Sequence, residues 1–413
     1  MSVRRIAVAL FTTAVLLVPA AMPAGASASS SIVPTIRPYP AAGTKSIGPG
    51  TASGNTNAQL AEVVPATVVP GWAATPELCP SSGGVSVTSI AVSGSRTVVL
   101  ERQYQCGSVS AYDTASGALQ WRVPYHLATS AWVSHTNRLV YVTHDEPATS
   151  SSHLVSALDL ATGTVRWSSP LLGGDIDSIG NGVLVGDTTM LDLATGSSVP
   201  RLKIPAGTSG GKSLVADGRV FRNSSTDVTA WSVKTGALLW SYKKVGTSAG
   251  GDALPAFHEG RLYVRSDYDS STVKVFSAAS GKVLRQLPVS TSPIAFDGDY
   301  GFLTASKQNA TSTVTAVDLR TGHRFWTRGL PDDPRPSVEI GSGPVVANGL
   351  LWLLHAPDTG THPVLTAFDE VTGATRSTTT LPCAAGVDGA LTVAQKRLFA
   401  SSECGVQTYV GPR

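Results

Sequence analysis

Residues 157–167 read Ala157-Leu158-Asp159-Leu160-Ala161-Thr162-Gly163-Thr164-Val165-Arg166-Trp167, and residues 316–326 repeat the same pattern from Ala316 to Trp326. The pattern is a small residue, an Asp two places later, then Thr-Gly, and a Trp four residues after the Gly. Seven full or partial copies lie 33 to 51 residues apart and centre on Gly117, Gly163, Gly196, Gly236, Gly281, Gly322 and Gly373. A period of this length is typical of the blades of a repeat protein.

The residue types in this phrase predict a tight turn between two strands. An Asp at the start of the turn can accept backbone N–H groups, and the Gly can take the positive φ that closes it. The Trp then falls on the following strand, opposite a small residue that leaves room for its ring. We therefore interpret the following as structural residues: Asp113, Asp159, Asp318, Asp369, the seven glycines, Trp121, Trp167, Trp240 and Trp326.

Composition favours one large all-β domain. The chain has 413 residues, 42% of them hydrophobic, with 41 Gly and 26 Pro, which suits many short strands joined by tight turns. A net charge of +3 lacks the basic excess expected of a nucleic-acid-binding protein, and no polybasic run indicates attachment to an anionic membrane.

The beginning of the chain resembles a secretory signal. Arg4 and Arg5 precede an apolar run that is too short to span a bilayer, and small residues follow at Ala24–Ala28. We expect residues 1–28 to be a signal peptide of the Sec type and residues 29–62, rich in Ser, Ala, Gly and Pro, to be a disordered spacer. Residues 63–413 then form the domain, and we expect a secreted, extracellular protein.

A count of strands predicts an eighth blade that is shared between the two ends of the domain. Five dipeptides indicate hairpins between first and second strands: Asn181-Gly182, Asp217-Gly218, Glu259-Gly260, Asp297-Gly298 and Asn348-Gly349. After the last phrase, three more strand-like runs follow near residues 390–394, 397–401 and 405–410, and residues 67–72 look like the missing fourth strand. We predict an eight-bladed β-propeller of four-stranded antiparallel blades, closed by the N-terminal strand.

Four cysteines occupy matching places in the first and eighth blades. Cys79 and Cys383 precede a first strand, whereas Cys106 and Cys404 lie in the hairpin between second and third strands. Four cysteines allow three pairings. Because both kinds of connection lie on one face of a propeller, we predict the disulfides Cys79–Cys106 and Cys383–Cys404, which suit an exported chain.

The repeated phrase resembles the repeat of the PQQ-like β-propellers, which include quinoprotein alcohol dehydrogenases and the outer-membrane assembly lipoproteins. The resemblance covers nearly the whole domain and implies the eight-bladed ring. Family members that use the quinone carry adjacent cysteines and calcium ligands, but no two cysteines are adjacent in this sequence. The chain also has no cysteine near the expected cleavage site for a lipid anchor. We therefore expect neither cofactor nor metal.

Other candidate groups have simpler structural interpretations. Gly207–Gly211 matches the hydrolase pattern around Ser209, but no helix pattern follows it. The acidic pairs Asp175/Asp177, Asp267/Asp269, Asp297/Asp299 and Asp332/Asp333 do not continue into a calcium loop, and the eight histidines lack zinc spacing. Asn223 and Asn309 stand in glycosylation sequons, and Trp132 and Trp352 lie outside the repeated phrase, where a sugar-stacking role stays open.

These observations favour a non-catalytic binding or scaffold module for a protein or cell-surface partner, which we expect to be a monomer. A rigid ring with variable loops on one face suits recognition. The alternative is an enzyme with a site in the central funnel, of which a quinoprotein-like dehydrogenase is the leading case and a lyase or glycan hydrolase a weaker one.

Overall fold

The computed structural model describes residues 46–47, 69–74, 86–103, 106–134, 136–146, 149–171, 174–186, 189–201, 211–244, 255–265, 272–287, 294–307, 310–330, 344–355, 362–382, 391–402 and 405–410. All of them belong to the second of two compact units, Tyr39–Arg413. The expected signal peptide and most of the expected spacer lie outside these residues. Within the described ranges there is no helix, and hence none that could cross a bilayer.

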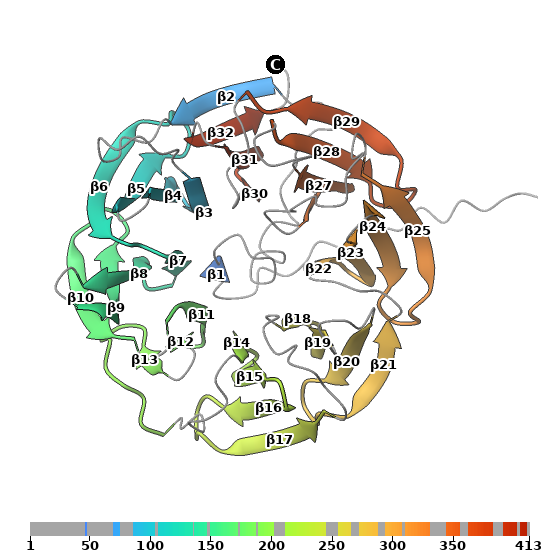
Figure 1. The fold of residues 1–413 in the computed structure, drawn as a ribbon, viewed down its shortest axis with the longest axis horizontal. Coiled ribbons are helices and arrows are strands. Elements are labelled where there is room, and N and C mark those ends of the chain that lie inside the picture. Colours follow the sequence, from blue (N-terminus) through green and yellow to red (C-terminus); the bar gives the residue numbers. More distant parts are fainter. Residues whose placement is uncertain are drawn as a thin grey trace, which may run out of the picture. The chain divides into compact units, whose positions relative to one another are not determined.

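Eight antiparallel sheets follow one another around a ring in this unit, and each sheet is one blade (Figure 1). Blades 1 to 4 comprise β3–β6 (Ser86–Ser93, Arg96–Gln103, Cys106–Asp113, Leu119–His126), β7–β10 (Ser130–Ser134, Leu139–Glu146, Thr149–Asp159, Val165–Pro170), β11–β13 (Ile176–Gly180, Val183–Gly186, Met190–Asp192) and β14–β17 (Lys212–Ala216, Arg219–Asn223, Asp227–Ser232, Leu238–Lys243). Blades 5 to 8 comprise β18–β21 (Ala256–His258, Arg261–Arg265, Val273–Ser277, Val283–Leu287), β22–β25 (Ile294–Asp297, Tyr300–Lys307, Ala310–Asp318, Arg324–Gly329), β26–β29 (Val345–Ala347, Leu350–His355, Val364–Asp369, Thr375–Thr380) and β30–β32 (Leu391–Ala394, Arg397–Ser402, Gly405–Val410) with β2 (Val69–Ala74). The predicted eight-bladed all-β propeller is confirmed.

Blade 8 is closed by a strand from the other end of the domain. β2, drawn in blue, lies beside β32, drawn in red, as the outermost strand of this blade (Figure 1). Val69 pairs with Val410 and Pro70 with Tyr409 in an antiparallel register. The ring is therefore sealed by hydrogen bonds between β2 and β32, as the strand count predicts.

Two blades depart from four strands. Blade 3 has three strands, followed by a single bridge between Leu191 and Ser198. Pro200 stands where four of the other six copies have Trp, and because proline has no N–H group it does not extend a strand there. Blade 2 gains a short inner strand, β1 (Ser46–Ile47), which pairs with β7 and comes from the segment expected to be a spacer.

The hydrophobic core is divided among the joints between blades. Eight clusters of buried side chains occur among the described residues, and each cluster combines residues of two consecutive blades. The joint between blades 8 and 1 has its own cluster, in which Phe399 and Val406 pack with Val99 and Tyr112. Each blade thus depends on its neighbours for the burial of both of its faces.

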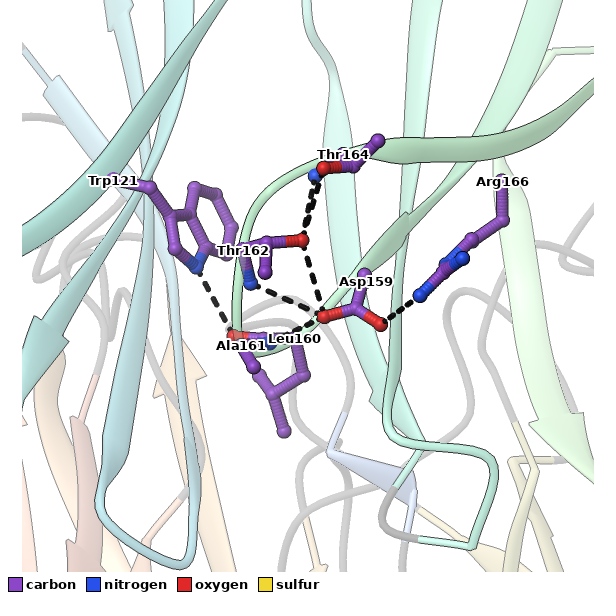
Figure 2. A network of polar contacts seen from close by, with 7 residues as sticks. All are labelled: Trp121, Asp159, Leu160, Ala161, Thr162, Thr164 and Arg166. Carbon is purple, nitrogen blue, oxygen red and sulfur yellow. Dashed lines mark hydrogen bonds and ion pairs between the residues drawn. The ribbon is translucent and has the colours of Figure 1, made fainter.

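The repeated phrase forms both the turn of one blade and the contact with the preceding blade. Figure 2 shows Asp159 accepting hydrogen bonds from the backbone N–H groups of Ala161 and Thr162 at 2.9 and 3.1 Å, and an ion pair with Arg166 at 2.7 Å. The indole Nε1 of Trp121, on the outer strand of blade 1, donates to the carbonyl oxygen of Leu160 at 3.0 Å. The phrase therefore links neighbouring blades as well as closing a hairpin.

Glycine is required in this turn for two independent reasons. Gly163 has a φ of +71°, and a Cβ atom placed there would lie 2.8 Å from the indole ring of Trp121. The same packing joins Trp167 to Gly196, Trp240 to Gly281 and Trp326 to Gly373. Blade 5 lacks the Trp, so that Gly322 in blade 6 has only a Leu287 methyl group at 3.5 Å.

The hairpin dipeptides between first and second strands also adopt the expected conformation, with one change of register. Asn181, Asp217, Glu259 and Asn348 all have positive φ, as do the glycines that follow them. In blade 6, however, Asp297 pairs with Tyr300 as the last residue of β22. The turn is therefore made by Gly298 and Asp299, and Asp297 belongs to the strand.

The predicted disulfides fall mostly outside the described residues. Cys79, Cys383 and Cys404 are not among them, and only the backbone of Cys106 is described, as the first residue of β5. The pairing therefore stays a prediction: non-reducing peptide mapping of the full chain is expected to recover Cys79 joined to Cys106 and Cys383 joined to Cys404. A peptide joining Cys79 to Cys404 would contradict it.

Candidate functional site

The two faces of the ring have different connections. Antiparallel pairing places the hairpins between first and second strands and those between third and fourth strands on one face, which we call the turn face. The connections between second and third strands, and those between blades, lie on the opposite face, which we call the loop face. The predicted structural residues of the repeated phrase all belong to the turn face. A ligand-binding role is therefore better sought among residues that do not repeat.

A buried carboxylate lies near the loop-face end of blade 1. Glu101 on β4 is 1% exposed and accepts hydrogen bonds from the hydroxyl groups of Ser108 at 2.6 Å and Tyr112 at 3.1 Å. Arg122 on β6 lies 3.6 Å from the same carboxylate and donates to Ser110 at 2.9 Å. Burial and the charge of Glu101 raise the pKa of the Tyr112 hydroxyl. The group forms one connected network across three strands.

Blade 2 has a histidine at the position that Glu101 occupies in blade 1. His144 Nδ1 lies 3.2 Å from the carbonyl oxygen of Asp145, and because a carbonyl only accepts, this nitrogen carries the proton. Nε2 then accepts from the Ser156 hydroxyl at 2.8 Å, and Ser156 in turn contacts Ser168 at 2.8 Å. Burial lowers the pKa of His144, which keeps the ring neutral.

This serine–histidine pair has a structural role. Ser156 is buried in the middle of β9, whereas a hydrolytic serine must be exposed at a turn to meet its substrate. The same arrangement recurs in blade 7, where His355 Nε2 lies 3.0 Å from the Thr366 hydroxyl. A contact that recurs at the same place in two blades is explained by the satisfaction of buried polar groups.

Charged groups also lie where the inner strands of blades 3 and 4 begin at the loop face. Asp177 on β11 accepts from Lys212 Nζ and from the backbone N–H of Ser213, both at 3.0 Å, across the joint between these blades. The Asp177 side chain is 1% exposed and that of Lys212 is 42% exposed. Asp175 is exposed beside them and accepts from the Thr129 hydroxyl of blade 2. The result is a fixed, mixed-charge edge at the mouth of the ring.

The remaining candidates divide into buried and undescribed residues. Trp132 and Trp352 are buried in the joints between blades, so neither ring is accessible for stacking on a sugar. Asn223 is also buried, which leaves no room for a glycan. Ser209, Asn309 and His135, with the pairs Asp267/Asp269 and Asp332/Asp333, lie outside the described residues. Within the described part of the chain, no group of three acidic, histidine or cysteine side chains has the geometry to hold a metal ion.

The described inner strands do not bring together the adjacent cysteines and calcium-ligating side chains that a quinone site would need. Their polar side chains instead join neighbouring blades: Ser89 donates to Ala131 O at 3.2 Å, and Ser178 accepts from Val215 N at 3.1 Å. We therefore derive no reaction through that group. Sequence reasoning missed Glu101, Lys212 and Arg122, although departures from the repeat at aligned positions could have indicated them.

The ring of eight blades, with Trp rings packed on the turn glycines, defines a PQQ-like β-propeller. The family described as outer membrane protein assembly factor BamB matches residues 105–299 and 310–409, well over half of the chain, and the chain belongs to this family. No curated protein sequence matches the chain.

Solved structures with the same fold include a BamB protein and two dehydrogenases. BamB from Moraxella catarrhalis is 19% identical, with 83% of this chain and 99% of that chain covered and a TM-score of 0.55. Quinohemoprotein alcohol dehydrogenase from Comamonas testosteroni is 13% identical, with 84% and 77% covered and a TM-score of 0.57. A europium-containing methanol dehydrogenase is 12% identical, with 81% and 84% covered and a TM-score of 0.57. At these identities the likeness establishes the fold alone.

Proposed function

We propose that this protein is an exported binding or scaffold module of the cell envelope, which docks a protein partner on its loop face. The observation that carries the proposal is the edge formed by Asp175, Asp177 and Lys212. Both Asp175 and Lys212 are accessible, and both are oriented by hydrogen bonds to a neighbouring group. Groups held in place before binding lose less conformational freedom when a partner arrives.

Membership of the BamB family supports this proposal over an enzymatic one. The family description names a role in the assembly of outer membrane proteins, which is a role in contact with other proteins. The buried polar networks of Glu101 in blade 1 and His144 in blade 2 are satisfied internally, as expected of a rigid support for a recognition surface. The dehydrogenase alternative rests on a likeness of fold and is tested separately below.

Blade 4 offers a matched pair of lysines for testing the docking face. Lys212 lies at the loop face, and Lys234 lies exposed in a hairpin at the turn face. A photo-crosslinking residue at position 175, introduced into the full chain in producing cells, is expected to give a protein adduct. In that background, Lys212→Glu is expected to reduce the yield of the adduct about tenfold, which corresponds to the loss of a contact worth about 1.4 kcal/mol. Lys234→Glu is expected to leave the yield unchanged.

Two results would contradict the proposal. One is an adduct yield that falls equally with both lysine variants, since the loop face would then have no special role. The other is alcohol or sugar oxidation, followed by dye reduction, after the purified protein is incubated with the quinone and Ca²⁺. That activity would establish the enzymatic alternative.

A further inference from the structure

Glu370 breaks the repeat at a buried position. It follows the turn aspartate Asp369 in blade 7 and is 7% exposed. The residues at the same place in the other blades are also buried, and five of the six are apolar: Thr114, Leu160, Leu193, Val233, Ala278 and Leu319. The fold therefore does not need a carboxyl group here.

The backbone of Glu370 is held on both sides. Its N–H donates to the carbonyl oxygen of Gly349 at 3.1 Å, and its own carbonyl accepts from Trp326 Nε1 of blade 6 at 2.9 Å. Trp326 belongs to the apolar cluster between blades 6 and 7. Within the described residues, Glu370 Oε2 accepts no hydrogen bond although it is buried. One oxygen of the carboxyl group, Oε2, thus lies at the joint of two blades without a donor among the described residues.

The side chain that faces Glu370 is Asp297 of blade 6. Because the hairpin of blade 6 is made by Gly298 and Asp299, Asp297 remains in β22, at a place where most other blades have a small residue: Ser93, Gly180, Ala216, Ala347 or Ala394. The carboxyl groups of Asp297 and Glu370 come within hydrogen-bonding reach of each other. Two carboxylates only accept, so this contact is a hydrogen bond only when one proton lies between them.

Other charged groups around the pair are already engaged. Asp369 accepts from the turn N–H groups and from Arg376 at 2.6 Å, and Asp318 accepts from the N–H groups of its own turn. Tyr300, on β23, is a further titratable neighbour: burial first, and then the charge of Glu370, raise the pKa of its hydroxyl. Asp299 is exposed and lies 4.0 Å from Arg261. Two carboxyl groups are too few for a divalent cation, which prefers six to eight oxygen ligands.

We propose that Asp297 and Glu370 form a proton-dependent latch between blades 6 and 7, in which one shared proton joins the two carboxyl groups. When the proton leaves, two negative charges, of buried Glu370 and half-buried Asp297, face each other at the joint and push the blades apart. The latch goes beyond the proposed docking function and does not depend on it.

The expected pH range follows from the environment of Glu370. Burial, and then the charges of Asp297 and Asp369, raise the pKa of its carboxyl group to about 8, from an ordinary value of 4.5. Because the folded state binds this proton more tightly than the unfolded chain, its stabilising effect is complete below about pH 4.5. The effect falls as pH rises and is lost above about pH 8.

The test is the thermal midpoint of the full chain between pH 5 and pH 9, for wild type and Glu370→Gln. Glutamine donates a hydrogen bond to Asp297 and does not titrate. We expect the wild-type midpoint to fall by on the order of 5 °C relative to that of Glu370→Gln across this range. Asp217→Asn, in the exposed hairpin of blade 4, is the matched control and is expected to follow wild type.

A second variant keeps the proposal testable if Glu370→Gln does not fold. Asp297→Asn removes the neighbouring charge, so the pH-dependent fall is expected to end at a lower pH than in wild type and to be smaller. Amide hydrogen exchange, corrected for its intrinsic pH dependence, is expected to rise in β26 above pH 8 in wild type only. Parallel pH curves for wild type and both joint variants would overturn the latch, as would a Ca²⁺-dependent rise of the midpoint that Glu370→Gln abolishes.

Discussion

Gly163→Ala is expected to lower the free energy of unfolding by about 3 kcal/mol. The new methyl group would meet the ring of Trp121 at 2.8 Å, and the φ of +71° is unfavourable for alanine. Trp121 cannot move away without breaking its hydrogen bond to Leu160 O. The measurement is the urea midpoint of unfolding at constant m-value.

Two matched variants separate steric overlap from backbone strain. Gly322→Ala changes the same turn at a φ of +79°, but the only neighbour of the new methyl group is a Leu287 carbon at 3.5 Å. Gly182→Ala changes a hairpin glycine at +81° with nothing within 4 Å. Both are expected to cost about 1 kcal/mol, the penalty for a left-handed alanine. Equal losses for all three variants would refute the role of the Trp contact.

Glu101→Gln is expected to lower stability by about 2 to 3 kcal/mol, because a buried charge network would lose its negative partner. The amide would remove the negative charge that lies 3.6 Å from Arg122 and would present N–H groups where three hydroxyl groups now donate.

The surface control is Asp217→Asn. This aspartate forms an ion pair with Arg219 but is 57% exposed. We expect a loss below about 0.5 kcal/mol, as for most exposed ion pairs. Comparable losses for the two variants, measured by urea unfolding at pH 7, would show that burial of Glu101 does not decide its contribution.

The architecture could be predicted from the sequence because its signal is local. The residues that form each turn lie within an eleven-residue phrase, so the turn can be recognised from the local sequence. Seven copies of this phrase give the order of seven blades, and the eighth follows from the strand count. Even the split blade was accessible, since only three strand-like runs follow the last phrase and residues 67–72 have the pattern of the missing fourth strand. Blade 3 was the exception, where Pro200 replaces the Trp.

The polar sites could not be predicted in the same way. Glu101, Asp177 and Glu370 act through partners on other strands or other blades, and nothing within a few residues of them reveals those partners. The hairpin register of blade 6 shows the difficulty: Asp297-Gly298 reads as a turn dipeptide, yet the turn begins one residue later and leaves Asp297 in a strand. A one-residue shift changes which face a side chain occupies.

The pairing of β2 with β32 imposes an order of events on folding. The ladder joins residue 69 to residue 410, so β2, which is synthesised before all the other strands of blade 8, waits for β32. Until then the nascent chain presents an open series of blades, with apolar faces at both ends and an edge available to other chains. Closing so long a loop costs entropy that only the completed joints offset. Ring closure therefore makes the final six strand residues, Gly405–Val410, the step that converts a growing stack into a finished molecule.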